Sequence, residues 1–442
     1  MKIKLPDNVR FIINELERQG YEAYAVGGCV RDTLLGREPG DWDITTSAKP
    51  EEVKTVFKKT VDTGIEHGTV TVIMDGTGYE VTTYRIDGKY SDGRHPDKVE
   101  FTPSLTEDLK RRDFTINAMA YNESTGMVDL FGGLEDLKKG IIRCVGNPKE
   151  RFNEDALRIF RAVRFSAQLG FDIEEGTKQA IKELAESLTI ISAERIQTEL
   201  VKLLMSDHPG KIRDCYELSI TTAILPEFDL MMATSQNTIH HRYTVGEHTI
   251  KVLENVPAER IVRITALLHD VAKPETKKVT EDGQEHFPDH QPIGADKAAG
   301  ILRRLKFDND TINKVKTLIR WHDARPETLA GLRRLLNNVG EELFPTLISF
   351  KYGDIMGQSE YKREEKLAVV DGYKASFEQI ISERQCFSLK QLAVTGNDLI
   401  AEGIPAGAEI GRCLKNLLDL VTEDQSLNDK ETLLSIVRDG KL

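Results

Sequence analysis

The sequence has 442 residues, of which 39% are hydrophobic and 30% charged, a composition typical of globular proteins, and its length predicts about two to four domains. No apolar run approaches the roughly 18–20 residues that span a bilayer, and five scattered cysteines exclude both a disulfide framework and a cysteine zinc site. The net charge of −12 argues against a basic nucleic-acid binder, although residues 110–165 carry eleven Lys/Arg against eight Asp/Glu. Because the amphipathic start lacks the apolar core of a signal peptide, we expect a cytoplasmic protein.

Strand and helix patterns divide the chain. Short alternating runs predict strands within the first ~145 residues, in YEAYAVGG, WDITT, TVTVIM and GYEVTTY. From about residue 150 helical periodicity predominates. Seven of the ten histidines fall between His240 and His322, which marks that segment as a separate module. The pattern predicts a strand-containing head followed by helical domains.

The segment GGCVRDTLLGREPGDWDITTS, residues 27–47, carries the strongest functional signal. Gly27 and Gly28 end a predicted strand and open a helix, where backbone N–H groups can cradle a triphosphate. Arg31 follows one turn into that helix, in reach of a phosphate. Asp41 and Asp43 are predicted on one face of the next strand, roughly 6–7 Å apart at Cα. This spacing suits carboxylates that hold two Mg²⁺ ions for nucleotidyl transfer, in an arrangement that resembles the superfamily of DNA polymerase β.

Further polar residues accompany this motif. Glu80, on GYEVTTY, is either a third carboxylate of the site or a solvated strand position. The segment RRDFTINAMAY places Arg111 and Arg112 where they suit phosphate groups. Asp113 either joins the metal carboxylates or orients an arginine. Residues 84–98 are polar and rich in glycine, and they predict a long hairpin loop or a mobile lid.

A predicted helix over NEDALRIFRAVRF carries charged residues every three positions. Its apolar residues define one face, and the other side bears Asp155, Arg158, Arg161 and Arg164. Simple ion pairing on an exposed helix is one interpretation. In the other, Asp155 accepts from the exocyclic amino group of cytosine or adenine while Arg158 donates to the ring nitrogen. Uracil and guanine reverse both positions, so one Asp/Arg pair would select C and A together.

Five motifs in order, GGCVRD, GDWDI, RRDFTINAMAY, FNEDALRIFRAVRF and SAERIQTEL, resemble the class II tRNA nucleotidyltransferases, the CCA-adding enzymes and bacterial poly(A) polymerases. The resemblance covers residues 20 to about 205 closely. It implies an α+β fold: a head with a small mixed sheet (1–145), then an all-α neck (146–225), a body or HD domain (236–360) and a tail (361–442) that grips the tRNA acceptor arm. The site residues that it implies are Mg²⁺ ligands at Asp41 and Asp43, a catalytic Arg112, nucleotide contacts at Gly28, Arg31, Arg112, Arg161 and Arg164, and base readers at Asp155 and Arg158.

The histidine-rich segment carries a second motif, in the order H…HD…H…H…D, that resembles the HD phosphohydrolase superfamily. Histidines and aspartates in that superfamily bind divalent metals that activate water. The ligands implied here are His248, His269, Asp270, His290, His322 and Asp354. His240, His241 and His286 are interpreted as incidental. A decayed HD domain that serves only as a scaffold is the alternative.

These patterns predict a transferase that adds C, C and A to the 3′ end of tRNA from CTP and ATP and releases pyrophosphate. The full-length loop at 84–98 favours retention of the final A addition, by comparison with CC-adding relatives. An A-adding enzyme or poly(A) polymerase is the alternative within that class, and an HD hydrolase of phosphoesters is the alternative from another class. No membrane and no DNA partner is expected.

Overall fold

The computed structural model describes residues 3–87, 99–236, 242–281 and 283–440, so most of the predicted loop at 84–98 and both His240 and His241 lie outside the described residues. The chain forms two compact units, Met1–Pro226 and Glu227–Leu442, and the finer division into four domains stays a prediction. Within the described ranges no helix is both long and apolar enough to cross a membrane.

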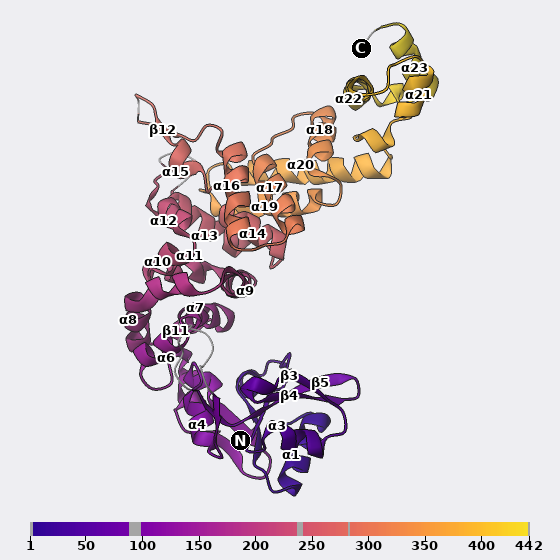
Figure 1. Ribbon diagram of the computed structural model, residues 1–442. Helices are drawn as coiled ribbons and strands as arrows, with labels where there is room; N and C mark the ends of the chain where they lie inside the picture. The colour runs from indigo at the N-terminus through magenta and orange to yellow at the C-terminus, as the bar shows by residue number, and fades with distance from the viewer. Residues whose placement is uncertain (1–2, 88–98, 237–241, 282, 441–442) are drawn as a thin grey trace. The chain divides into compact units, whose positions relative to one another are not determined.

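The head contains a seven-stranded mixed sheet in the order β3-β4-β5-β2-β1-β8-β9. Figure 1 labels β3, β4 and β5 of this sheet. β2 pairs with β5 in parallel, whereas the other neighbours pair antiparallel. The strands are β1 (Ala23–Val26), β2 (Ile44–Thr46), β3 (Thr60–Gly64), β4 (Thr69–Met74), β5 (Thr77–Thr83), β8 (Met119–Asn122) and β9 (Gly126–Asp129), beside a small hairpin of β6 (Arg85–Asp87) and β7 (Val99–Phe101). The predicted α+β class with a mixed sheet is confirmed.

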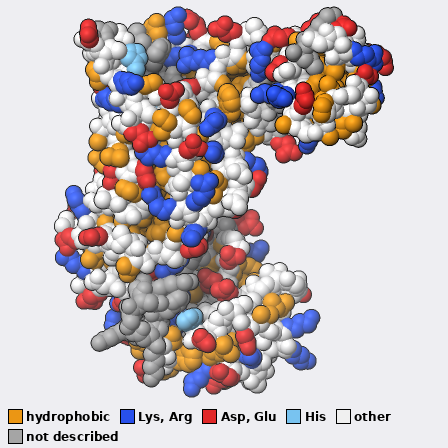
Figure 2. Space-filling model, turned by 45° about the horizontal axis from the view of Figure 1, so that its top comes forward, with side chains coloured by type: hydrophobic (Ala, Val, Ile, Leu, Met, Phe, Trp, Pro, Cys, Tyr) orange, Lys and Arg blue, Asp and Glu red, His pale blue; other side chains and the backbone are white. Residues whose placement is uncertain are grey.

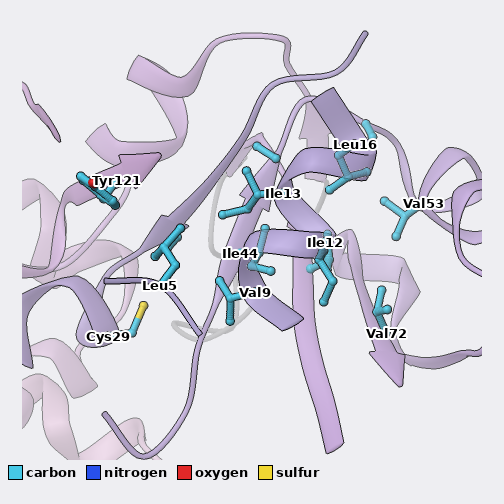
Figure 3. Packing of buried hydrophobic residues seen from close by; sticks show 14 of the residues in the cluster. Leu5, Val9, Ile12, Ile13, Leu16, Cys29, Ile44, Val53, Val72 and Tyr121 are labelled. Carbon is cyan, nitrogen blue, oxygen red and sulfur yellow. The ribbon is translucent and has the colours of Figure 1, made fainter. Parts of the chain in front are cut away.

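The head core lies between this sheet and the first helix, α1 (Asp7–Arg18). Val9, Ile12, Ile13 and Leu16 recur at helical spacing and are almost fully buried. Figure 3 shows them packed with Ile44 of the sheet. The remaining head helices are α2 (Gly28–Leu34), α3 (Pro50–Val56), α4 (Leu105–Lys110) and α5 (Gly133–Lys139). This packing fixes the strand ends of the sheet near which the predicted carboxylates lie.

The strand predicted to carry both aspartates begins later than expected, at Ile44. β1 ends at Val26, and Gly27, with φ +81°, donates its N–H to the Met119 carbonyl of β8 at 3.1 Å and does not pair with β2. The Val26 N–H still donates to the Asp43 carbonyl at 3.0 Å, which holds Asp43 in extended geometry. Asp41 and Asp43 therefore lie just ahead of β2.

Helices form the rest of the first unit. They are α6 (Pro148–Glu154), α7 (Leu157–Leu169), α8 (Glu175–Leu184), α9 (Ala193–Leu204), α10 (Ile212–Glu217) and α11 (Ile220–Ile224), with a two-stranded sheet of β10 (Ile141–Ile142) and β11 (Asp172–Ile173). α12 (Pro226–Ala233) follows. α7 packs against α9 and is apolar on its predicted face.

The single helix predicted across NEDALRIFRAVRF is in fact two helices. Asp155 has extended backbone, φ −139° and ψ 104°, and ends α6. Its Oδ1 accepts a hydrogen bond from the Leu157 N–H at 3.1 Å and so caps the first turn of α7. Arg158 and Arg164 are only 9% and 5% exposed, so the charged side of α7 is buried and the exposed-helix interpretation is wrong.

The second unit is helical apart from a short hairpin of β12 (Lys278–Val279) and β13 (Glu285–His286). Its helices are α13 (Val245–Asn255), α14 (Arg260–Leu268), α15 (Lys273–Thr276), α16 (His290–Arg304), α17 (Asn309–Trp321), α18 (Leu329–Val339), α19 (Phe344–Gly357), α20 (Arg363–Ser382), α21 (Gly396–Ala401), α22 (Ala408–Glu423) and α23 (Lys430–Arg438). α13 packs against α14 and α19, and α17 packs against α14 and α16. His248 lies in α13, His290 begins α16, and His269 and His322 directly follow α14 and α17. Acidic and basic side chains are interspersed over the face that Figure 2 shows, so neither sign of charge dominates that face.

Candidate active site and candidate metal centre

Three carboxylates meet at the edge of the head sheet where β2 and β5 begin to pair. Ile44 of β2 is in register with Val81 of β5. The residues that precede them, Asp43 just before β2 and Glu80 within β5, therefore lie next to each other. Burial raises the pKa of Glu80, and the charges of Asp43 and Asp41 raise it further. Burial and Asp41 likewise raise the pKa of Asp43, against the effect of Arg112. A bound cation would relieve this mutual repulsion, which fits the residues to a metal.

The glycine turn between β1 and α2 places a guanidinium over this site. A Cβ on Gly27 would lie 3.0 Å from Nη1 of Arg112, and the residue's positive φ also disfavours any other side chain. Arg112 Nη2 lies 3.5 Å from the buried carboxylate of Asp108, which also binds Arg111. Asp108, which the sequence interpretation missed, therefore anchors both predicted phosphate-binding arginines.

Arg31, predicted to contact phosphate, is only 8% exposed. Its Nε and Nη2 donate to the Asp32 carboxylate at 2.8 and 2.9 Å. Its Nη1 donates to Asn117 Oδ1 at 2.6 Å. The side chain thus links the first turn of α2 to the RRDFTINAMAY segment.

Asp113 does not join the metal carboxylates, because its carboxylate binds an arginine of α7. Oδ2 accepts from Nε and Nη2 of Arg161 at 2.9 and 2.6 Å, and Oδ1 accepts from Asn117 and from the Phe114 N–H. Burial raises the pKa of Asp113, but Arg161 and the hydrogen bonds outweigh burial and hold it well below its ordinary value. The structure therefore decides for the arginine-orienting alternative.

The predicted base-reading residues lie together at the junction of α6 and α7, each held by a different partner. Arg195 of α9 donates to Asp155 Oδ2 at 2.9 Å. Arg158 donates to Glu154 Oε2 at 2.6 Å and to the carbonyls of Arg151 and Arg111 at 3.1 and 2.9 Å. The backbone N–H of Arg158 donates to the Asp155 carbonyl at 3.0 Å. The pair is thus adjacent through the backbone, and Glu154 and Arg195 are partners that the sequence interpretation missed.

Arg164, the last arginine of α7, is also held by hydrogen bonds. Arg164 donates through Nε to Glu199 Oε2 of α9 and through Nη1 to Gln168 Oε1, both at 2.7 Å. The guanidinium carbons of Arg31, Arg161 and Arg164 lie 5.1, 5.2 and 3.5 Å from the ring centroid of Phe165. Three guanidinium groups, each paired with a carboxylate, therefore also contact one aromatic ring.

In the second unit all six predicted ligands of the histidine motif converge. Their donor atoms form two groups, one of His248, His269 and Asp354 and one of Asp270, His290 and His322. The closest approaches are 3.0 Å between His248 Nε2 and Asp354 Oδ1 and 3.1 Å between His269 Nε2 and Asp270 Oδ2. The four imidazoles are buried, and so is Asp270.

Backbone carbonyls fix the orientation of these imidazoles. Nδ1 of His269, His290 and His322 lies 2.8, 2.8 and 2.7 Å from the carbonyls of Ala266, Phe287 and Ile319. Nδ1 of His248 lies 3.2 Å from the Gly357 carbonyl. Because a carbonyl only accepts, each Nδ1 carries a proton, and the Nε2 atoms face one another. His290 Nε2 and Asp270 Oδ1 are buried without a hydrogen-bond partner among the described residues. The donor set fits a divalent metal.

A cavity of about 920 Å³ opens onto this cluster. Its wall includes five of the six predicted ligands, all but His248, together with Glu285, Asp323 and several cations, of which Lys273 and Lys351 are buried. Lys351 donates to the carbonyls of His322 and Ala324, at 2.5 and 2.8 Å, and burial lowers its pKa to about 8. His286, interpreted as incidental, also lines this cavity.

Family models match three stretches of the chain: the poly(A) polymerase head domain over residues 23–143, the "Probable RNA and SrmB- binding site of polymerase A" over 170–232, and domain 2 of tRNA nucleotidyltransferases over 291–437. The CCA-adding enzyme of Levilactobacillus brevis is 37% identical over 97% of this chain and 97% of its own length. This chain belongs to the CCA-adding enzyme family. The CCA-adding enzyme of Limosilactobacillus reuteri is 39% identical over 99% of both chains.

The solved structure of a CCA-adding enzyme has the same fold along nearly all of the chain. The Bacillus stearothermophilus CCA-adding enzyme in complex with CTP superposes with a TM-score of 0.76 at 30% identity, over 99% of this chain and 98% of the other. The Thermotoga maritima CCA-adding enzyme complexed with tRNA shares the fold, with a TM-score of 0.62 at 22% identity. CCA-adding enzymes are metal-dependent nucleotidyltransferases, in agreement with the carboxylates at the head sheet.

Proposed function

We propose that this member of the CCA-adding enzyme family adds C, C and A to the 3′ end of tRNA, using CTP and ATP and releasing pyrophosphate. The observation that carries the proposal is the meeting of Asp41, Asp43 and Glu80 at the sheet edge, next to the glycine turn and Arg112. Family membership over almost the whole chain supports it. The relatives named above are CCA-adding enzymes, which favours this function over A addition alone.

The head residues divide the work of binding a nucleotide and a primer. Two Mg²⁺ ions held by Asp41 and Asp43 would activate the ribose 3′-hydroxyl and stabilise the departing pyrophosphate. The backbone of Gly28 and the guanidinium of Arg112 would bind the triphosphate, with Asp108 holding Arg112 in place. Arg31 is tied to Asp32 and Asn117, so we assign it to keeping the glycine turn rigid as well as to binding phosphate.

Asp155 and Arg158 would read the base with the hydrogen-bond acceptor and donor positions that their protein partners do not use. A carboxylate offers about four acceptor positions, and the Leu157 N–H and Arg195 use two of them. A guanidinium has five N–H donors, and Arg158 directs three at Glu154, Arg151 and Arg111. One side chain therefore still accepts and the other still donates, as cytosine and adenine require. Arg161 and Arg164 would hold the phosphates or support the pair.

The helical parts of the chain would bind the tRNA acceptor arm, and we place the protein in the cytoplasm, where tRNA is processed. Five buried cysteines without disulfides agree with that location. The test is one gel. tRNA that ends at the discriminator base, or after one or two C residues, is incubated with Mg²⁺ and single nucleotides. Extension of the first two substrates by CTP and of the third by ATP is expected, and addition of A alone would instead identify an A-adding enzyme.

A second function is favoured by the histidine cluster. Four imidazoles with fixed Nδ1 protons, together with Asp270 and Asp354, would hold a divalent transition metal beside the cavity. A metal there supplies an activated water, and the cationic wall would bind a phosphoester. We therefore propose a metal-dependent phosphohydrolase in the second unit. Release of phosphate from nucleotide monoesters or cyclic RNA ends, lost on metal removal, is the measurement.

A further inference from the structure

We propose that Asp323, a residue outside the predicted ligand set, is a metal ligand that completes a second cation position in the histidine cluster. The inference rests on the proposed metal centre. It begins with Asp270, whose two carboxylate oxygens face different histidines. Oδ2 lies 3.1 Å from His269 Nε2 and 3.8 Å from His248 Nε2, whereas Oδ1 lies 3.6 Å from His290 Nε2 and 3.9 Å from His322 Nε2. Asp270 thus stands between two pairs of imidazoles.

The two halves differ in their carboxylates. The half with His248 and His269 has a second carboxylate, Asp354, whose Oδ1 lies 3.0 Å from His248 Nε2 and 4.0 Å from His269 Nε2. The half with His290 and His322 has only Asp270 among the predicted ligands. Two neutral imidazoles and half of a shared carboxylate leave a divalent cation poorly neutralised.

Asp323 occupies the corresponding place in that second half. Its Oδ2 lies 3.4 Å from His290 Nε2 and 3.7 Å from His322 Nε2. Two ligand atoms bound to one cation at about 2.1 Å lie about 3–4 Å apart, so these separations already match. With Asp323, each half has two imidazoles and two carboxylates, and Asp270 bridges them.

The environment of Asp323 is that of a metal ligand. Its side chain, 37% exposed, lines the cavity. Gln291 Nε2 donates to Oδ2 at 2.9 Å, which orients the carboxylate as the outer partners of metal ligands do. Of the buried atoms of the cluster that have no hydrogen-bond partner among the described residues, His290 Nε2 and Asp270 Oδ1 belong to this same half, and Asp270 Oδ2 faces the other half. His290 Nε2 therefore lies 3.4 Å from the Asp323 carboxylate that Gln291 orients.

The test counts ions in the full-length chain. All variants carry Asp41→Asn and Asp43→Asn, so that only ions of the second unit are counted. Metal-free protein is titrated with Mn²⁺ and with Co²⁺, and bound metal is measured by mass spectrometry after gel filtration. We expect two ions per chain in this background and one after Asp323→Asn. Asp354→Asn, on the opposite half, should also leave one ion. Asp296→Asn, an exposed acidic residue of α16, should leave two.

Each outcome decides the matter. Two ions after Asp323→Asn, bound with unchanged affinity, would overturn the inference and leave the metal centre standing. One ion before any change at Asp323 would overturn it as well, whereas no ion at all would refute the metal centre itself. Circular dichroism verifies the fold of each variant. If Asp323→Asn does not fold, Asp323→Ser removes the same carboxylate, and the visible Co²⁺ spectrum reports one or two ligand fields.

Discussion

Asp113 and Arg161, 48 residues apart in sequence, form a two-pronged ion pair in which both Nε and Nη2 of the arginine donate to Oδ2 of the aspartate. The aspartate belongs to the RRDFTINAMAY segment of the head, and the arginine to α7. The pair therefore fixes the helix with the base-reading residues relative to the segment that carries Arg112. It connects the two parts of the proposed nucleotide site.

Replacing Asp113 with asparagine should loosen that connection. Arg161 would lose its charged partner in a mostly buried place, which costs on the order of 1–3 kcal/mol. The first thermal unfolding transition should move down by a few degrees, and the KM for CTP and ATP should rise. Calorimetry and steady-state kinetics measure both. Asp62→Asn, at an exposed carboxylate of β3, serves as a control, and equal effects of the two variants would contradict this role.

Asp41→Ala or Asp43→Ala should abolish C and A addition alike, because both reactions use one metal pair. We expect a loss of several orders of magnitude in kcat, with tRNA binding largely kept. Single-turnover extension and gel shift measure the two quantities. Asp62→Ala, an exposed carboxylate of β3, is the matched control. A double variant that still extends tRNA at a tenth of the normal rate would refute the assignment.

Glu80→Gln tests the third carboxylate. If Glu80 helps to hold Mg²⁺, the Mg²⁺ concentration for half-maximal rate should rise about tenfold, while the rate at saturating Mg²⁺ falls less. Removing its charge also removes repulsion from Asp41 and Asp43. A solvated residue would change neither quantity. The Mg²⁺ dependence of CTP incorporation distinguishes the two.

The base-reading proposal predicts a change in specificity. Asp155→Ala removes the acceptor for the amino group and the repulsion against the carbonyl of uracil, so discrimination against UTP should shrink by about ten- to a hundredfold. Arg158→Ala should lower CTP and ATP use together without such a gain for UTP. Because Arg195 holds Asp155, Arg195→Met should weaken CTP and ATP use in parallel. Values of kcat/KM for the three nucleotides test all variants, and wild-type ratios in Asp155→Ala would sink the proposal.

Replacing His269 and Asp270 with alanine should leave nucleotide addition near normal, because these residues belong to the second compact unit. Bound transition metal and any phosphoesterase activity should disappear. His286→Ala, on the same cavity wall but outside the ligand set, should keep the metal. Unchanged metal content in the double variant would instead favour a purely scaffolding domain.

Local sequence determined much of this protein. The strand–glycine–helix turn, the Asp41/Asp43 spacing and the α+β order of elements follow from patterns within a few tens of residues, where backbone conformation and hydrophobic periodicity act directly. Even the six residues of the histidine motif could be named from the sequence, because few other arrangements bring those residue types together in that order.

Only the tertiary structure decided the partners of the charged residues. Asp113 forms an ion pair with Arg161 rather than joining the metal site. Asp155 pairs with Arg195, and Arg158 pairs with Glu154. The break between α6 and α7 redirected Asp155, and a helical pattern alone could not reveal it because the residues on both sides are good helix formers. The proximity of Asp323 to His290, which is far from it in sequence, likewise depends on tertiary packing. A carboxylate takes its function from the groups that surround it in space, and burial against segments tens of residues away sets those surroundings.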